Sequence, residues 1–65
     1  MNSLGQIIKS RRKELGRTQG TLALLTRVSI NTIVAIERGS KSPTIDTLSQ
    51  IADALGLELR LDIKK

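Results

Sequence analysis

The sequence predicts an all-α core of four helices followed by a single C-terminal β-strand. Four stretches carry apolar residues at helical spacing, and each has a hydroxyl residue or a glycine at its ends. After Gly56 the apolar residues instead alternate with charged ones, which is the period of a strand. The chain has 65 residues and no Phe, Trp or Tyr, so its small core must be built from aliphatic side chains.

The first helix is predicted over residues 3–15. Gly16 follows it and is a natural C-terminal residue for a helix. Apolar residues recur along one side of this segment at helical spacing, and we expect that side to face the core. They are Leu4, Ile7, Ile8 and Leu15.

Arg12 lies on the apolar side of this first helix. An unpaired guanidinium would be costly in that position, so we expect a carboxylate beside it. Glu37 is the only acidic residue between Glu14 and Asp46. The sequence therefore predicts an ion pair between Arg12 and Glu37, the alternative being that the Arg12 side chain extends to solvent or to a phosphate.

The second helix should begin with Thr18 as its N-cap and run to about Leu25. Leu22 and Ala23 are expected to face inward, with alanine small enough for the next helix to cross closely. Leu24 and Leu25 follow. We expect one of them to add to the core, while an exposed pair would mark a surface that contacts another protein.

Ser29 is the expected N-cap of a third helix that buries Ile33 and Ile36 and ends at Gly39. Two short helices joined by a tight turn form a helix-turn-helix pattern. This pattern indicates a protein that binds duplex DNA through the second helix of the motif, which is the third helix of this chain, at residues 29–38.

The start of that third helix would show Ile30 and Asn31 to water, which has little structural purpose. A major groove would use both side chains. Asparagine forms a bidentate pair with an adenine edge, while isoleucine and the methyl of Ala35 can touch thymine methyl groups. The alternative for Asn31 is a solvated amide or one that caps the local backbone.

A fourth helix is predicted from its cap Thr44 to Gly56, and its role is that of a scaffold. Its inner side should consist of Ile45, Leu48, Ile51, Ala52 and Leu55.

The strand that follows is predicted from four alternating apolar residues, Leu57, Leu59, Leu61 and Ile63. No other segment has the period of a strand, and a lone strand leaves its backbone groups unpaired. We therefore expect residues 1–56 to form the DNA-binding domain and residues 57–65 to pair across a two-fold symmetric homodimer. The alternative is an extended tail that folds onto its own helices or onto a different protein.

Positive charge is concentrated in the first two thirds of the chain. Residues 1–42 carry eight Lys or Arg against two Glu, and the remainder is nearly neutral. A polyanion would be drawn to the basic part with an affinity that falls as salt rises, the alternative being an ordinary solvated face.

The composition also predicts what the protein lacks. There is no Cys, His or Tyr and no convergent carboxylate pair, so we expect no enzymatic activity, no cofactor, no metal and no small-molecule ligand. No apolar run approaches the about 20 residues that a membrane span needs, and the first residues lack the order of a signal peptide. We expect a cytoplasmic, nucleoid-associated protein that does not bind membranes.

The residues from Thr18 to Gly39 resemble the Cro and phage-repressor, or Xre-type, helix-turn-helix family. The resemblance covers about residues 4–56 and implies a lambda-repressor-like domain that binds a pseudo-palindromic operator as a homodimer. The residues that carry it are Thr18-Gln19, Leu22-Ala23, Val28-Ser29, Asn31-Thr32-Ile33 and Ile36-Glu37-Arg38-Gly39.

This resemblance also implies which side chains touch DNA. The positions that match Ile30, Asn31 and Ala35 face base edges in the family, and those that match Arg12 and Glu37 form an internal ion pair. The implied phosphate contacts are Thr18, Gln19, Ser29, Thr32, Arg38 and Lys41.

Arg27 departs from the family pattern because it stands at a turn position where glycine is usual. We expect either a positive φ at Arg27 or a rearranged turn, and we expect its charge to reach a phosphate.

A fourth helix followed in the sequence by a single strand is an arrangement that resembles the HipB-like antitoxins. Those proteins pair C-terminal strands across a dimer and bind a kinase-fold toxin. An antitoxin with a toxin partner that autoregulates its operon is therefore the alternative function.

Overall fold

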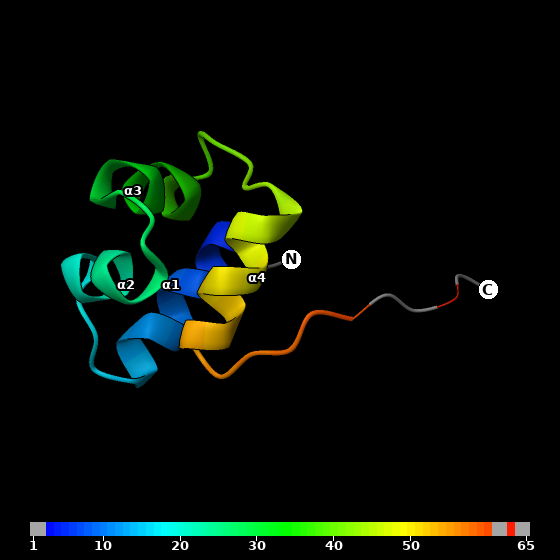
Figure 1. Ribbon diagram of the computed structural model, residues 1–65, viewed down its shortest axis with the longest axis horizontal. Coiled ribbons are helices and arrows are strands. Elements are labelled where there is room, and N and C mark those ends of the chain that lie inside the picture. The colour runs from blue at the N-terminus through cyan, green and yellow to red at the C-terminus, as the bar shows by residue number, and fades with distance from the viewer. Residues whose placement is uncertain (1–2, 61–62, 64–65) are drawn as a thin grey trace.

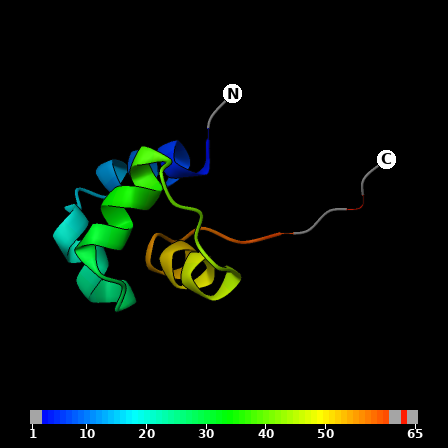
Figure 2. The same cartoon turned by 90° about the horizontal axis from the view of Figure 1, so that it is seen from above.

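The computed structural model describes residues 3–60 and residue 63. This part of the chain contains four α-helices. The helices are α1 (Leu4–Glu14), α2 (Gln19–Thr26), α3 (Ile30–Arg38) and α4 (Ile45–Ala54). α1 and α2 pack against α3, and α2 also packs against α4. Figure 1 shows α2 and α3 on one side of the bundle, and Figure 2 shows the segment after α4 running away from it. The predicted all-α core of four helices is confirmed.

Each helix begins at a hydroxyl side chain that caps its first turn. In every case the Oγ atom accepts a hydrogen bond of 3.0–3.2 Å from the backbone N–H three residues later. The caps are Ser3, Thr18, Ser29 and Thr44. α3 ends at Gly39, whose φ of 86° is the left-handed conformation that closes a helix.

The core consists of six aliphatic side chains, each no more than 2% exposed. Every helix contributes at least one of them, so a chain without aromatic residues closes its core by bringing helices into short-range contact. The six are Ile8, Leu22, Ile33, Ile36, Ile51 and Leu55.

The buried side of α1 differs from the predicted one. Gly5, Ile8 and Arg12 are its buried residues. Three leucine and isoleucine side chains that were expected to face inward are instead between 38% and 43% exposed, so this part of the prediction is wrong. They are Leu4, Ile7 and Leu15.

Gly5 is the physical reason for this rotation of α1. A Cβ atom at Gly5 would lie 2.4 Å from the carbonyl oxygen of Ile36 and 2.7 Å from that of Glu37. The two backbones can approach this closely only where α1 has no side chain. The contact therefore turns the glycine side of α1 toward α3 and moves Leu4 and Ile7 to the edge.

Three further apolar residues lie outside the core. Ile45 is the first residue of α4 and is 75% exposed, so its predicted inward position is wrong. Leu24 and Leu25 are 82% and 55% exposed, and neither adds to the core as was expected of one of them. The inner side of α2 is occupied by Leu22 and Thr26, which leaves this pair on the outer side.

Two arginines from outside α4 bind the carbonyl groups at its C-terminal end. Nε of Arg11 donates to the carbonyl of Leu55 at 2.9 Å, and Nη1 of Arg17 donates to that of Ala54. The last turn of α4 contains no basic residue of its own. The arginines supply the positive charge that favours a helix C-terminus and tie α4 to α1.

The segment after α4 forms no strand among the described residues, so the predicted strand is not observed in the single chain. Leu57 is half-buried against the core, while Leu59 and Ile63 are 44% and 93% exposed. Leu61 lies outside the described residues. A strand requires hydrogen bonds to a neighbouring strand, and the four helices of one chain offer none.

Replacing Gly5 with alanine should destabilise the fold, because the new methyl group meets two backbone carbonyl oxygens. Overpacking of this kind costs about 1–3 kcal/mol. Gly20→Ala is a matched control, since Gly20 is also the second residue of its helix and a Cβ there meets nothing closer than 3.8 Å. Urea denaturation should give a lower free energy of unfolding for Gly5→Ala than for wild type. For Gly20→Ala it should give a value higher by up to about 1 kcal/mol. Equal stability of the two variants would contradict this account of α1.

Candidate nucleic-acid interface

Arg12 and Glu37 form a buried, bidentate ion pair between α1 and α3. Nε of Arg12 lies 2.8 Å from Oε2 of Glu37, and Nη2 lies 3.0 Å from Oε1. Arg12 also donates through Nη1 to the carbonyl of Arg17, and Gln19 donates through Nε2 to Oε1 of Glu37 at 3.1 Å. The predicted pair is therefore present, and it connects α1, α2 and α3.

This geometry shifts the pKa of both partners. The hydrogen bond to Glu37 raises the pKa of Arg12 against the opposing effect of burial. Burial is the largest influence on Glu37 and would raise its pKa. The hydrogen bonds from Arg12 and Gln19, with the charges of Arg12 and Lys9, outweigh it, so the pKa of Glu37 lies below its ordinary value. Both groups are charged near neutral pH.

The outward side of α3 is apolar with a single amide. Ile30 is 48% exposed, Asn31 is exposed, and Val34 and Ala35 are half-buried. The three buried residues of α3 are Ile33, Ile36 and Glu37. Base contacts are predicted from the sequence for Ile30, Asn31 and Ala35. Val34 is not among these three, although its position four residues after Ile30 places it beside that residue on the helix.

The turn between α2 and α3 has the geometry of a helix-turn-helix. The two helices are bent by 117° relative to each other, within the range of about 90–120° for this motif. Arg27 adopts φ 58° at the end of α2, so the positive φ is observed and the turn is not rearranged. No single helix of the described residues is long and apolar enough to cross a membrane, and the one pair that would reach this length is α2 with α3, which this bend interrupts.

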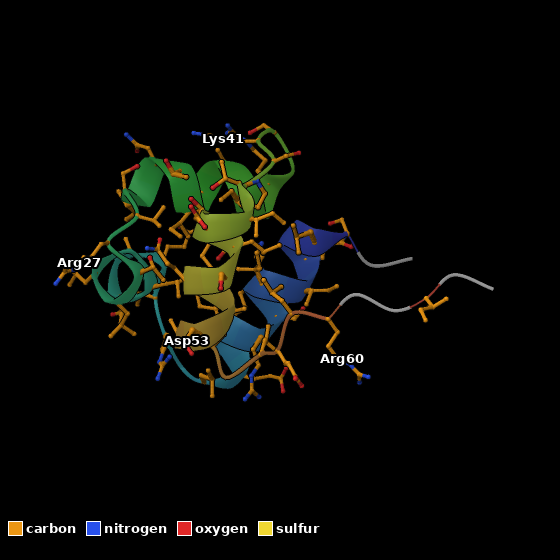
Figure 3. The ribbon with its side chains drawn as sticks, turned by 45° about the vertical axis from the view of Figure 1, so that its right-hand side comes forward. Arg27, Lys41, Asp53 and Arg60 are labelled. Atoms are coloured by element: carbon orange, nitrogen blue, oxygen red, sulfur yellow. The ribbon has the colours of Figure 1, made fainter. Side chains whose placement is uncertain are left out.

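Basic residues lie at both ends of α3. Figure 3 shows Arg27 near its start and Lys41 beyond its end, while Asp53 and Arg60 lie away from it. Arg38 is exposed in the last turn of α3. The only acidic residue between Glu14 and Asp46 is Glu37, whose carboxylate is buried in the ion pair. The exposed surface around α3 is therefore positively charged.

The remaining candidate phosphate contacts lie near the starts of α2 and α3. Thr18 and Ser29 are N-caps, and their hydroxyl oxygens lie 3.0 and 2.9 Å from those of Thr21 and Thr32. Gln19 is half-buried and uses its amide N–H to bind Glu37. Helix N-termini attract phosphate because their first N–H groups lack partners within the helix.

The bent helix pair and the basic surface around its second helix define a DNA-binding helix-turn-helix protein. The helix-turn-helix family HTH_3 matches residues 8–61, and the chain belongs to this family. It is 46% identical over 57 residues to an uncharacterized HTH-type transcriptional regulator of Methanothermobacter thermautotrophicus, a match that covers 88% of this chain and 83% of that protein.

A second relative is an immunity repressor protein of Bacillus phage phi105. It is 39% identical over 57 residues, which is 88% of this chain and 40% of the repressor. The chain thus spans two fifths of that repressor's length. The predicted resemblance to the Cro and phage-repressor family is confirmed.

The described residues contain no group of three or more metal-ligating side chains. The side chains that gather around α3 are amides, hydroxyls, methyl groups and cations, and of these the cations, hydroxyls and amides are groups that can bind phosphate.

The ion pair makes stability depend on pH in a defined direction. Because the pKa of Glu37 is lowered in the folded state, its contribution is complete above the unfolded value of about 4.3 and is lost as pH falls through the folded value. Glu37→Ala should cost about 3–5 kcal/mol at pH 7, since it leaves Arg12 charged and unpaired.

The control is the double variant Arg12→Met with Glu37→Leu, which should lose less stability at pH 7 than Glu37→Ala because it leaves no buried charge without a partner. Urea denaturation at pH 7 and pH 3 should show that wild type loses more stability than the double variant. The same loss in both proteins would rule out Glu37 as a source of the acid sensitivity.

Proposed function

We propose that this DNA-binding transcriptional regulator acts as a repressor and binds a pseudo-palindromic operator as a homodimer, with α3 in the major groove. The observation that carries the proposal is the outward side of α3, where Ile30 and Asn31 are exposed between basic residues. The phi105 immunity repressor, a relative of this chain, supports the role of repressor.

The length of α3 agrees with this docking. At about 1.5 Å per residue, Ile30 and Arg38 are separated by about 12 Å along the helix, which equals the width of the major groove of about 12 Å. Arg27 at one end, and Lys41 with Arg38 of the last turn at the other, are suitably placed for the phosphates on the two sides of the groove. Ile30, Asn31 and Ala35 then face base edges.

The hydroxyl and amide side chains near the helix starts complete the proposed phosphate contacts. Each belongs to a helix whose N-terminus favours negative charge. They are Thr18, Gln19, Ser29 and Thr32.

Homodimerisation is supported by an apolar groove away from α3. It lies between α1 and α4 and is lined by Leu4, Ile7, Leu48 and Leu59. Ile45 extends this apolar surface beside Leu48 and Leu59. We propose that a second copy covers the groove and that residues 57–63 of the two copies pair as antiparallel strands, which would bury these side chains and satisfy the unpaired backbone.

A role as an antitoxin is a second proposal. It is favoured by Leu24 and Leu25, which form an exposed apolar pair on α2 of the kind that binds another protein. A kinase-fold protein encoded beside this gene should then bind wild type but not Leu24→Ser with Leu25→Ser. Undiminished binding of that protein to the variant would rule out this surface.

Asn31→Ala should weaken binding to a duplex selected from a random-sequence library by about 1–3 kcal/mol and relax the preference at one base pair. Arg38→Ala or Lys41→Ala should weaken binding to all duplex sequences alike. Each should also reduce the slope of log affinity against log salt concentration by about one. Gln50→Ala, an exposed amide on α4, is the matched control and should bind as wild type does. Fluorescence anisotropy across a salt series measures both quantities. An unchanged sequence preference in Asn31→Ala would contradict the proposed base contact.

Leu59→Glu should convert the dimer to a monomer, because it places a charge in the apolar groove. Affinity for the selected duplex should fall at the same time, since binding at two half-sites is lost. Glu14→Gln, a change at an exposed residue of α1 outside the groove, should leave the dimer intact. Sedimentation equilibrium gives the mass, and a dimer of unchanged stability in Leu59→Glu would refute this interface.

A further inference from the structure

We infer that this protein selects its site mainly by the C5-methyl groups of pyrimidines, so that 5-methylcytosine can replace thymine at the contacted positions and uracil cannot. The inference rests on the proposed function, because it assumes that α3 enters the major groove. It adds Val34 and a surface on α2 to the residues that determine specificity.

Methyl groups dominate the proposed recognition surface. Ile30, Val34 and Ala35 present only hydrocarbon, and Asn31 is the one side chain among the four that can form a hydrogen bond with a base. Ile30 is 48% exposed, which is too much for a residue whose purpose is to fill the core. A base edge placed against these side chains is read by shape and by apolar contact.

The apolar surface continues from α3 onto α2. A Cβ atom at Gly20 would lie 3.8 Å from Cδ1 of Ile30, so the isoleucine side chain lies over the glycine of the neighbouring helix. An open hollow is present here, lined by Ala23, Leu24 and Val28 together with Arg27 and Ser29 of the turn. Against its hydrocarbon part, a polar base edge would lose water without gaining a hydrogen bond, whereas a methyl group has no hydrogen bond to lose.

Guanine has no suitable partner in the middle of this surface. Its O6 and N7 atoms are recognised by the paired donors of Arg or Lys. The basic residues at α3 are confined to its ends, and Nη2 of Arg38 lies 3.3 Å from Oγ of Ser40. Asn31 matches adenine instead. The surface therefore favours A·T pairs, in which thymine supplies the methyl group.

The same chemistry predicts how modified bases behave. Thymine and 5-methylcytosine have a methyl group at the same ring position and differ at position 4, which an apolar side chain does not distinguish. Uracil pairs as thymine does but lacks the methyl group. Ile30 and Val34 should therefore respond to the presence of the methyl group rather than to the identity of the base.

The test uses the full chain and a duplex that it selects from a random-sequence library. Each thymine of that duplex is replaced in turn by deoxyuridine, and affinity is measured by fluorescence anisotropy. At the contacted positions each replacement should weaken binding about four-fold, the effect of removing one buried methyl group. At positions where Asn31 does not read the paired adenine, 5-methylcytosine·guanine should bind about four-fold more tightly than cytosine·guanine.

Protein variants assign the methyl contacts. Ile30→Ala and Val34→Ala should each abolish the deoxyuridine effect at their own positions, while Leu15→Ala, an exposed leucine at the end of α1, should retain it at all positions. If the affinity for the selected duplex changed less than two-fold for every deoxyuridine replacement, the inference would be overturned and the proposed function would stand. A library that yields no preferred sequence would overturn both.

Discussion

The ion pair between Arg12 and Glu37 is the contact on which the arrangement of the first three helices depends. One carboxylate receives hydrogen bonds from α1 and α2 while belonging to α3. Burying two charges is costly, and the cost is offset only when the remaining polar atoms have partners. No buried side-chain nitrogen or oxygen among residues 3–60 and 63 lacks a hydrogen bond. The pair therefore fixes the position of α3 relative to its neighbours without leaving an unsatisfied group.

The same contact determines the charge of the proposed DNA-binding surface. Glu37 is an acid in the helix that would enter the groove, where an exposed carboxylate would repel phosphate. Its burial against Arg12 leaves the basic residues at both ends of α3 unopposed. Gly5 assists by letting α1 approach the carbonyl end of α3 closely enough for the guanidinium to reach it. Packing and electrostatics thus depend on one another.

Much of the fold could be predicted from the sequence because its signals are local. The hydroxyl caps and Gly39 act within a few residues, so the four helices are close to their expected bounds, and the ion pair followed from the scarcity of acids around Glu37. The rotation of α1 could not be predicted, because it depends on how closely another backbone approaches Gly5. A strand at the C-terminus depends on a partner chain, which one sequence does not supply. Val34 was missed although its spacing from Ile30 was available, because the sequence does not show how far a side chain between the buried and exposed sides of α3 reaches the surface.

In the proposed complex with DNA, the outward side of α3, from Ile30 to Arg38, meets the bases. Backbone amide chemical shifts of the labelled protein, recorded while the selected duplex is added, test it most directly. We expect the largest changes in the first half of α3 and in the turn at Arg27, with small changes along α4. Largest changes along α4 with α3 unaffected would contradict it.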